Sequence, residues 1–334
     1  MTTLTNLLRT QSNSGLLRPL DVRRDLNSVA DLVEQCFADT LDVDGQRYIQ
    51  QMRNLARSPG ALAWISSFSD RSNLPLSGYV WEQDGMLVGN LTLIPYLVRG
   101  DQYLLIANVA VQPAYRRQGI ARRLTAKALE HARQRGVQAV WLHVREENEP
   151  AIHLYRSLGF TERARRTTWL SNGQPQRAQA ALAPDQRVRV TSRRNQDWHA
   201  QQKWLRRNYP VEVTWHLSFK AAALQPGIRG GLYRLLNDVE TRQWSAWSGN
   251  RLLGVLAWNT SQAYADNLWL ATSQEDEDLA ASALLAHARR QLPARRPLSL
   301  DYPAGQAAEA IQQAGFHIHQ TLIWMSVEIR SRMR

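Results

Sequence analysis

The chain has 334 residues, which is long for one hydrophobic core and favours two domains. Hydrophobic residues make up 44% and charged residues 21% of it, as in ordinary globular proteins. No apolar run approaches the ~18 residues of a membrane span, and we expect neither a membrane protein nor an export signal in the first residues. The single cysteine, Cys36, excludes an internal disulfide framework, so a cytoplasmic location is expected.

The net charge of +12 favours anionic partners, either nucleic acid or phosphorylated small molecules. The arginines are scattered singly or in pairs, with no long basic arm and no nucleic-acid recognition motif. A solvated, arginine-rich surface explains most of this charge. We therefore expect no specific nucleic-acid partner.

The first half alternates strands and helices in chain order. The predicted strands cover 16–24, the two sides of the Asp84-Gly85 turn, 104–111, 137–144 and 160–170. The predicted helices cover 25–40, 45–57 with Asp44 as N-cap, 117–134 ending before Gly136, and 149–158 stopped by Gly159. This alternation predicts a mixed α/β domain.

Residues 171–187 are rich in Pro, Gly, Gln and Ala and are the best linker candidate. Beyond them the pattern recurs: an offset of 156 places His131-Ala132-Arg133 on His287-Ala288-Arg289 and Gly159-Phe160 on Gly315-Phe316, and an offset of 159 pairs Asn108 with Asn267. A diverged internal repeat explains these matches. We predict domains at 1–175 and 188–334, joined by a linker at 176–187.

The two copies differ at one functional point. The first has YRRQGIA at 115–121, where the second has the acidic SQEDEDL at 273–279. The first amides of a helix lack intrahelical partners and carry partial positive charge. A glycine there lets a ligand approach the backbone, so Gly119 with its neighbouring arginines predicts a phosphate site. The strand ending near Pro113 offers an edge to a linear ligand, and the combined shape fits coenzyme A.

These residues also resemble a family. Arg116-Arg117-Gln118-Gly119-Ile120-Ala121 matches the Arg/Gln-x-x-Gly-x-Gly/Ala signature of the GNAT superfamily of acetyl-CoA-dependent N-acetyltransferases. The segment NEPAIHLYRSLGF at 148–160 matches its second hallmark, and the local pattern is most similar to the ribosomal-protein and peptide N-terminal acetyltransferases. The resemblance, which covers Val109 to Phe160, implies two tandem GNAT-like domains, each a twisted mixed β-sheet flanked by helices. The second has lost the coenzyme A motif.

The resemblance also implies residue roles. Tyr155 would protonate the departing thiolate, and Asn148 would meet the amide-bearing arm of the cofactor. Backbone groups would bind the pantetheine arm at one stretch and the pyrophosphate at another: Val109, Ala110 and Val111 for the arm, and Arg116, Arg117, Gln118, Gly119, Ile120, Ala121 and Arg122 for the pyrophosphate.

The chain departs from the family pattern at His143, where peptide-acetylating relatives often have a glutamate base. An imidazole with an ordinary pKa of about 6.5 suits proton removal from an amine. The alternative is that His143 faces the interior or solvent and that a water chain carries the proton.

Three further features have simple structural explanations. Asp39, Asp42 and Asp44 lie where this family shapes its acceptor site, but turns and helix capping explain them as well. Tyr48 stays ambiguous, and Cys36 is expected to be a core residue. Most tryptophans beyond residue 185 are expected in the core, and no residue spacing indicates a metal site.

The sequence therefore predicts an acyltransferase that moves an acetyl group from acetyl-CoA to a primary amine by direct transfer. A non-catalytic acyl-CoA sensor or scaffold is the alternative. The acceptor, its acyl-chain preference and the oligomeric state stay open.

Overall fold

The computed structural model describes residues 15–57, 77–171, 187–215, 217, 219–292 and 295–329. The chain forms two compact units. Unit 1 contains 1–144, 148–161 and 325–334, and unit 2 contains 145–147 and 162–324. The proposed linker at 176–187 falls almost entirely outside the described residues, so the predicted boundaries at 175 and 188 stay a prediction.

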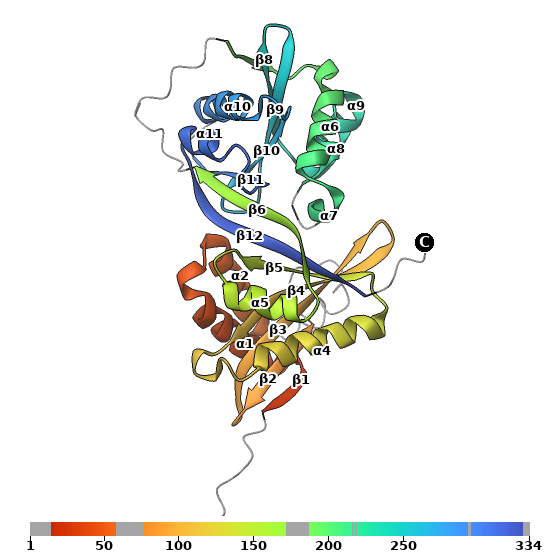
Figure 1. Cartoon of the computed structure of the whole chain (residues 1–334), viewed down its shortest axis with the longest axis vertical. Coiled ribbons are helices and arrows are strands. Elements are labelled where there is room, and N and C mark those ends of the chain that lie inside the picture. The colour runs from red at the N-terminus through yellow and green to blue at the C-terminus, as the bar shows by residue number, and fades with distance from the viewer. Residues whose placement is uncertain are drawn as a thin grey trace, which may run out of the picture. The chain divides into compact units, whose positions relative to one another are not determined.

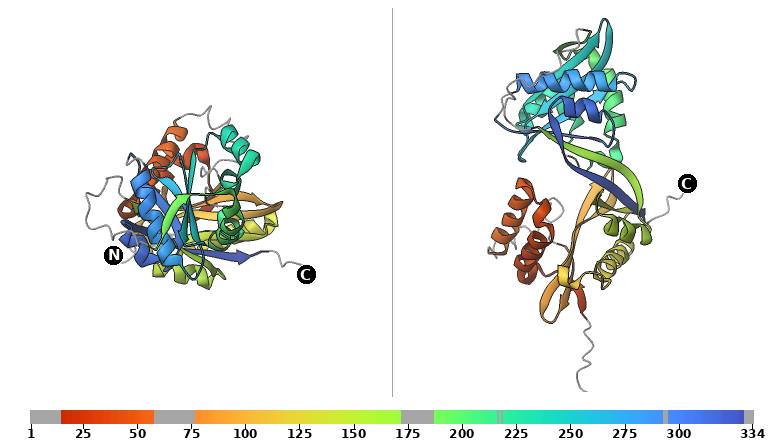
Figure 2. Two further views of the ribbon diagram at one scale, coloured as in Figure 1. Left: turned by 90° about the horizontal axis from the view of Figure 1, so that it is seen from above. Right: turned by 60° about the vertical axis from the view of Figure 1, so that its left-hand side comes forward.

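Unit 1 is a mixed sheet with helices on both faces (Figure 1). Its strands follow the order β1-β2-β3-β4-β5. They are β1 (Leu16–Pro19), β2 (Gly78–Gln83), β3 (Met86–Val98), β4 (Asp101–Val111) and β5 (Ala139–Arg145). The helices are α1 (Val22–Phe37), α2 (Val43–Ala56), α4 (Ile120–Arg135) and α5 (Glu149–Ser157). In the right-hand view of Figure 2, α1 and α2 cover one face and α4 the other.

Each face of this sheet has an apolar contact with its helices. Val80 and Ala110 belong to the buried cluster that α1 and α2 form on one face. On the other face, a Cβ at Gly89 would lie 2.9 Å from Ile120 and 3.3 Å from Leu124 of α4. The even-numbered residues of β3 around Asn90 therefore face α1 and α2, since side chains alternate along a strand.

Unit 2 repeats this order of strands and helices, with β6 added before it, β12 after it, and α6 to α9 in place of α1 and α2. Its strands are β6 (Thr161–Ser171), β7 (Arg189–Ser192), β8 (Thr241–Ser248), β9 (Arg251–Asn259), β10 (Asp266–Thr272), β11 (Leu298–Pro303) and β12 (Phe316–Glu328). Its helices are α6 (Trp198–Asn208), α7 (Val211–Thr214), α8 (Ala221–Leu224), α9 (Gly227–Asn237), α10 (Glu277–Gln291) and α11 (Ala308–Gln313). The strand order β12-β6-β11-β10-β9-β8-β7 includes β6, which pairs antiparallel with β11.

The predicted fold class and internal repeat are confirmed. The elements β1, α1, β2, β3, β4, α4, β5 and α5 have counterparts in β7, α6, β8, β9, β10, α10, β11 and α11. Gly159 and Gly315 follow α5 and α11 with φ of 92° and 85°. Five of the tryptophans assigned to the core are buried: Trp244, Trp247, Trp258, Trp269 and Trp324.

Several predicted boundaries are wrong for identifiable reasons. The first strand ends at Pro19 rather than at residue 24, because the Asp21 side chain accepts from the Arg23 amide and starts α1 at Val22. The N-cap of α2 is Asp42 and not Asp44. Within the described residues, no helix is both long and apolar enough to cross a membrane.

Candidate active site

The first feature of the site is the start of α4. Gly119 is its N-cap, with φ 78° and ψ 5°, and Arg117 also has a positive φ of 62°. A Cβ built on Gly119 meets no atom of the described structure within 4 Å, so the space in front of it is open. The Arg123 amide donates to the Gly119 carbonyl at 3.0 Å. The amides that precede it, from Ile120 to Arg122, point out of the helix start, which is the geometry that binds phosphates.

Two predicted arginines are anchored to the protein beside this helix start. The Arg116 Nε donates to the Val111 carbonyl at 3.1 Å, which ties the loop to the end of β4. The Arg122 guanidinium donates to Ser157 Oγ at 2.7 Å, which ties α4 to the end of α5. Both arginines leave positive charge next to the open amides, and both connect the elements on which the other predicted site residues lie.

The second feature is the free edge of β4. Its parallel pairing with β5 runs from Tyr103 opposite Ala139 to Ile106 opposite Leu142, although β4 continues to Val111. Val109, Ala110 and Val111 thus lie on a part of β4 that is paired with β3 alone. A linear, amide-bearing ligand would find backbone groups there, because unpaired strand edges offer both donors and acceptors.

A β-bulge lies within this stretch. Asn90 of β3 faces Ala110, while Thr92 faces Ala107, so that Asn108 and Val109 share the single position opposite Leu91. Asn108 has a left-handed backbone with φ 50°. A bulge leaves its extra residue out of the regular ladder and re-aims the backbone there.

The third feature is α5. Asn148 is its N-cap and accepts from the Ala151 amide at 3.2 Å. Tyr155 is 6% exposed, and its ring packs edge-on against Phe160 with centroids 5.9 Å apart. Burial raises the pKa of Tyr155 to about 12. The phenol is therefore protonated throughout the neutral range, as a proton donor requires.

His143 directly follows the last residue of β5 that pairs with β4. It is half-buried and lies between the buried residues Leu142 and Val144. The imidazole is therefore placed where the two strands stop pairing. Its assignment as base stays a proposal.

The acidic residues near the first two helices have structural roles. Asp42 accepts from the Gly45 amide at 2.8 Å as the N-cap of α2, and Asp44 pairs with Arg47 at 3.2 Å. Cys36 is half-buried against the α1–α2 cluster and its Sγ lies 3.4 Å from the Val111 carbonyl. In the described part of the chain, no three His, Cys, Asp or Glu side chains are grouped to hold a metal ion.

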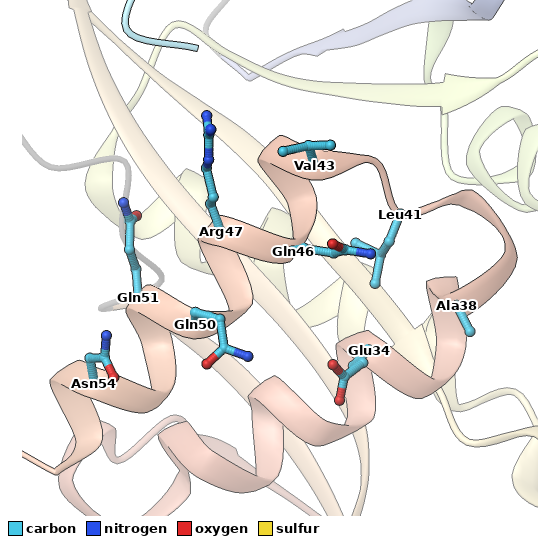
Figure 3. A pocket seen from close by; sticks show the side chains of 9 residues that line it. All are labelled: Glu34, Ala38, Leu41, Val43, Gln46, Arg47, Gln50, Gln51 and Asn54. Atoms are coloured by element: carbon cyan, nitrogen blue, oxygen red, sulfur yellow. The ribbon is translucent and has the colours of Figure 1, made fainter. Parts of the chain in front are cut away.

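A groove of about 610 Å³ lies between α1 and α2 (Figure 3). Amide side chains dominate its α2 side, and Glu34, which pairs with Arg53, comes from α1. Its lining residues are Glu34, Ala38, Leu41, Val43, Gln46, Arg47, Gln50, Gln51 and Asn54. None of the predicted cofactor or catalytic residues is among them, so this groove is separate from the site on β4, α4 and α5.

Unit 2 differs from unit 1 at the corresponding strand. The register of β10 with β9 is unbroken from Asn267 to Thr272, without a bulge. The glycines Gly89 and Gly254 follow equivalent hairpin turns and face Val111 and Thr272 respectively. Thr272 therefore corresponds to Val111, and Asn267 does not correspond to Asn108 as the offset of 159 predicted.

Side chains of α6, and of the residue that follows it, form hydrogen bonds with the backbone of β10. The Asn208 amide donates to the Leu270 carbonyl at 3.2 Å, and the Leu270 amide donates to the Tyr209 hydroxyl at 3.3 Å. Arg207 donates to the Thr272 carbonyl at 2.9 Å, as Arg116 does to the corresponding Val111 carbonyl in unit 1. The amide and the carbonyl of Leu270, which correspond to those of Val109, are thus already bonded within unit 2.

The start of α10 is acidic. A pocket of about 660 Å³ there is lined by Glu275, Asp276, Glu277, Asp278 and Glu309, among others. Carboxylates at this position repel a pyrophosphate, so the exchange of YRRQGIA for SQEDEDL reverses the charge at the place where unit 1 has its open amides.

Two polar residues beside the bulge, Asn90 and Thr92, are not among the site residues predicted from the sequence. Both are fully buried, and Asn90 lies in the apolar stretch GNLTL. Asparagine is unfavourable inside a strand, so a buried Asn in such a stretch is the signal that could have found the bulge.

Comparison with known proteins agrees with this geometry. Residues 39–160 match the family model described as "Acetyltransferase (GNAT) family". The chain is 41% identical over 91 residues to a mycothiol acetyltransferase of Thermomonospora curvata, which covers 27% of this chain and 29% of that protein. It is 49% identical over 55 residues to the [ribosomal protein bS18]-alanine N-acetyltransferase of Escherichia coli K12, covering 16% and 37%. The matches thus span about a third of these relatives.

The fold likeness extends further. A GCN5-related N-acetyltransferase from Sphaerobacter thermophilus superposes with a TM-score of 0.56 at 15% identity, over 95% of this chain and 96% of that one. The chain therefore shares the fold of this GCN5-related N-acetyltransferase. The residues that match the family model, 39–160, contain β4, the start of α4, β5 and α5.

Proposed function

We propose that the chain is an acetyl-CoA-dependent N-acetyltransferase whose reaction takes place in unit 1. The observation that carries this proposal is the contrast between the units. Unit 1 combines open amides at Gly119 with a bulged β4 edge, whereas unit 2 has an acidic helix start and a β10 bonded by its own side chains. The match of residues 39–160 to the GNAT family model supports the same reaction.

The substrate acetyl-CoA would bind in two parts. Its pyrophosphate would accept hydrogen bonds from the amides around Gly119, Ile120 and Ala121, strengthened by the arginine charge nearby. Its pantetheine arm would bond the backbone of Val109 and the amide of Val111, whose carbonyl already accepts from Arg116, with Asn148 beside it. These contacts fix the thioester at the end of β4 and α5, where orientation itself accelerates the reaction.

The transfer would be direct. The amine nitrogen of the acceptor attacks the thioester carbon, and an amide of the β4 bulge stabilises the oxyanion. The C–S bond breaks, and the thiolate takes the proton of the Tyr155 hydroxyl, which the raised pKa keeps in place until then. The amine proton leaves to His143 or to water. The products are an N-acetylated amine and coenzyme A with a free thiol.

The acceptor is a primary amine on a peptide N-terminus or a small molecule. The names of the relatives, a mycothiol acetyltransferase and a ribosomal-protein alanine N-acetyltransferase, include both kinds of acceptor. An acceptor screen that follows release of the coenzyme A thiol would identify the class. It also separates an enzyme from a sensor, because a sensor binds acetyl-CoA without releasing thiol.

Calorimetry with acetyl-CoA tests the binding site. Gly119→Glu places a carboxylate among the open amides and should abolish binding. Gly85→Glu is the matched control: Gly85 has a φ of 75°, has nothing within 4 Å of a built Cβ, and lies in a hairpin turn of the same unit. Both variants carry the same backbone strain. Loss of binding in both, or in neither, would contradict the proposed site.

A further inference from the structure

Four polar side chains surround the β4 bulge on the face of the sheet that carries α1 and α2. We call Tyr48, Asn90, Thr92 and Asn108 the bulge cluster. Asn90 lies opposite Ala110, which belongs to the α1–α2 cluster together with Tyr48. Polar groups at this depth are unusual because they lose hydration, so each needs a hydrogen bond to offset that cost.

The cluster bonds to the strained residue of the bulge from two sides. The side-chain amide of Asn90 donates to the main-chain carbonyl of Asn108 at 3.0 Å and to Thr92 Oγ1 at 3.4 Å. The side-chain amide of Asn108 donates to the Tyr48 hydroxyl at 2.8 Å and to Thr92 Oγ1 at 3.5 Å. Both the main chain and the side chain of Asn108 are therefore held.

Tyr48 brings α2 into this arrangement. It lies on α2 and is half-buried, and burial raises the pKa of its hydroxyl to about 12, so the group stays neutral and accepts the bond from Asn108. A non-glycine residue at φ 50° is strained, and such a backbone persists only where its surroundings fix it. The bond from Asn108 to Tyr48 is the shortest of those that fix it.

Unit 2 provides an internal comparison. In the aligned hairpins, Val255 and Ala257 of β9 take the places of Asn90 and Thr92, and β10 has no bulge. The polar cluster and the bulge are thus present together in unit 1 and missing together from the β9–β10 pair. Apolar side chains cannot bond a carbonyl that leaves the ladder, which explains why the two features go together.

We propose that Tyr48 is a positioning residue: through Asn108 it fixes the bulge so that the Val109 amide faces the thioester carbonyl. This rests on the function proposed above. Tyr48 touches neither substrate in this account, and it acts only by fixing the oxyanion donor. Since α2 borders the groove in Figure 3, the bond also connects that helix to the reacting strand.

The first test uses the chain without ligand. Hydrogen exchange of the amides at 107–111 is measured in wild type and in Tyr48→Phe, which removes only the hydroxyl. Exchange should accelerate about tenfold or more in this variant. Tyr79→Phe is the control, because it also removes a partly buried hydrogen bond of unit 1, to His131 Nδ1 at 3.0 Å, but on the face of the sheet that carries α4. Equal exchange in Tyr48→Phe and Tyr79→Phe would overturn the proposal.

The second test measures the reaction. Tyr48→Phe should lower kcat about tenfold, less than the hundredfold or more that losing an oxyanion donor costs, while KM for acetyl-CoA stays within about twofold. Asn108→Gly keeps the left-handed backbone without the side chain and should give a similar loss. The double variant should be no worse than either single one, because both remove the same bond.

A spectroscopic signal separates positioning from a general structural effect. The carbonyl stretch of bound acetyl-CoA, labelled with carbon-13 at that carbon, should shift to lower frequency in wild type and shift less in Tyr48→Phe. If Tyr48→Phe showed the same carbonyl frequency for bound acetyl-CoA and the same kcat as wild type, the proposal would be overturned. If wild type does not bind acetyl-CoA, the proposed function and any catalytic role of Tyr48 fall, while hydrogen exchange still decides whether Tyr48 holds the bulge.

Discussion

Arg123 of α4 lies over the indole ring of Trp81 in β2, with its Cζ 5.3 Å from the ring centroid. The sequence groups Arg123 with the cations that surround Gly119, but its guanidinium is stacked on the sheet of unit 1. A cation over an aromatic face is an attractive contact in itself. Arg123 therefore stabilises the packing of α4 and is distinct in role from Arg116 and Arg122.

Replacing Arg123 should affect stability and not binding. Arg123→Met keeps an unbranched apolar side chain over Trp81 and removes the charge, which should lower the free energy of unfolding by ~0.5–1 kcal/mol. The dissociation constant for acetyl-CoA should stay within about threefold of wild type. Urea unfolding and calorimetry measure the two quantities, with Arg23→Met, an exposed arginine of α1, as the control. If acetyl-CoA bound tenfold more weakly to Arg123→Met, Arg123 would have to be counted among the residues of the phosphate site.

Tyr155 should control the rate and not the affinity. Tyr155→Phe removes the proposed proton donor to the sulfur and should lower kcat ~100-fold, at the lower end of what general acids contribute. Binding of acetyl-CoA should change little because the ring and its contact with Phe160 are kept. Steady-state kinetics with thiol detection measures kcat, and calorimetry measures binding. A variant with full turnover would exclude Tyr155 as the acid.

The pKa of Tyr155 also predicts a pH dependence. Since burial raises this pKa to about 12, the phenol keeps its proton up to pH 10, and no alkaline loss of kcat below that pH should come from Tyr155. The neutral phenol makes its full contribution to the free energy of unfolding below the ordinary pKa of about 10. That contribution is lost as the pH rises from about 10 to 12. Unfolding measured from pH 9 to 12 should therefore show a smaller alkaline loss in Tyr155→Phe. An alkaline limb near pH 9 that disappears in this variant would contradict the assignment.

Local turn chemistry explains what the sequence predicted well. Asp84-Gly85 places a hairpin between β2 and β3, and Gly136 ends α4 in a left-handed conformation with φ 62°. These signals depend on a residue's own backbone preference, so they are readable without the rest of the fold. The Gly119 helix start belongs to the same class.

The bulge and the assignment of β6 to unit 2 depend on distant residues. The apolar alternation of LLIANVAV predicts a strand but not that Asn108 adds a residue opposite Leu91, because this register comes from pairing with β3. Likewise β6 follows α5 in the chain but pairs with β11, more than 120 residues later in the sequence. Such long-range pairings have no local signal.

His143 should shape the acid side of the pH profile. Imidazole is the side chain that titrates near neutrality, so a base at this position loses activity as pH falls. His143→Gln keeps a polar group but cannot titrate, and should lower kcat and flatten the acid limb. His153→Gln, at an exposed position on α5, is the control. The same acid limb in wild type and in His143→Gln would assign proton removal to water.

Unit 2 should contribute stability rather than a second cofactor site. Tyr302, fully buried, donates to Glu277 Oε1 at 2.6 Å and accepts from the Asn208 amide at 2.8 Å. Tyr302→Phe removes one buried hydrogen bond from each partner and should lower the free energy of unfolding by ~1–3 kcal/mol. Tyr233→Phe, at a half-buried position on α9, should cost less than ~0.5 kcal/mol. Calorimetry should find one acetyl-CoA site per chain in wild type and in both variants. A second acetyl-CoA site that is lost in Tyr302→Phe would contradict this prediction. It would show that β10 still binds a cofactor and that the side chains bonded to its backbone support that site instead of blocking it.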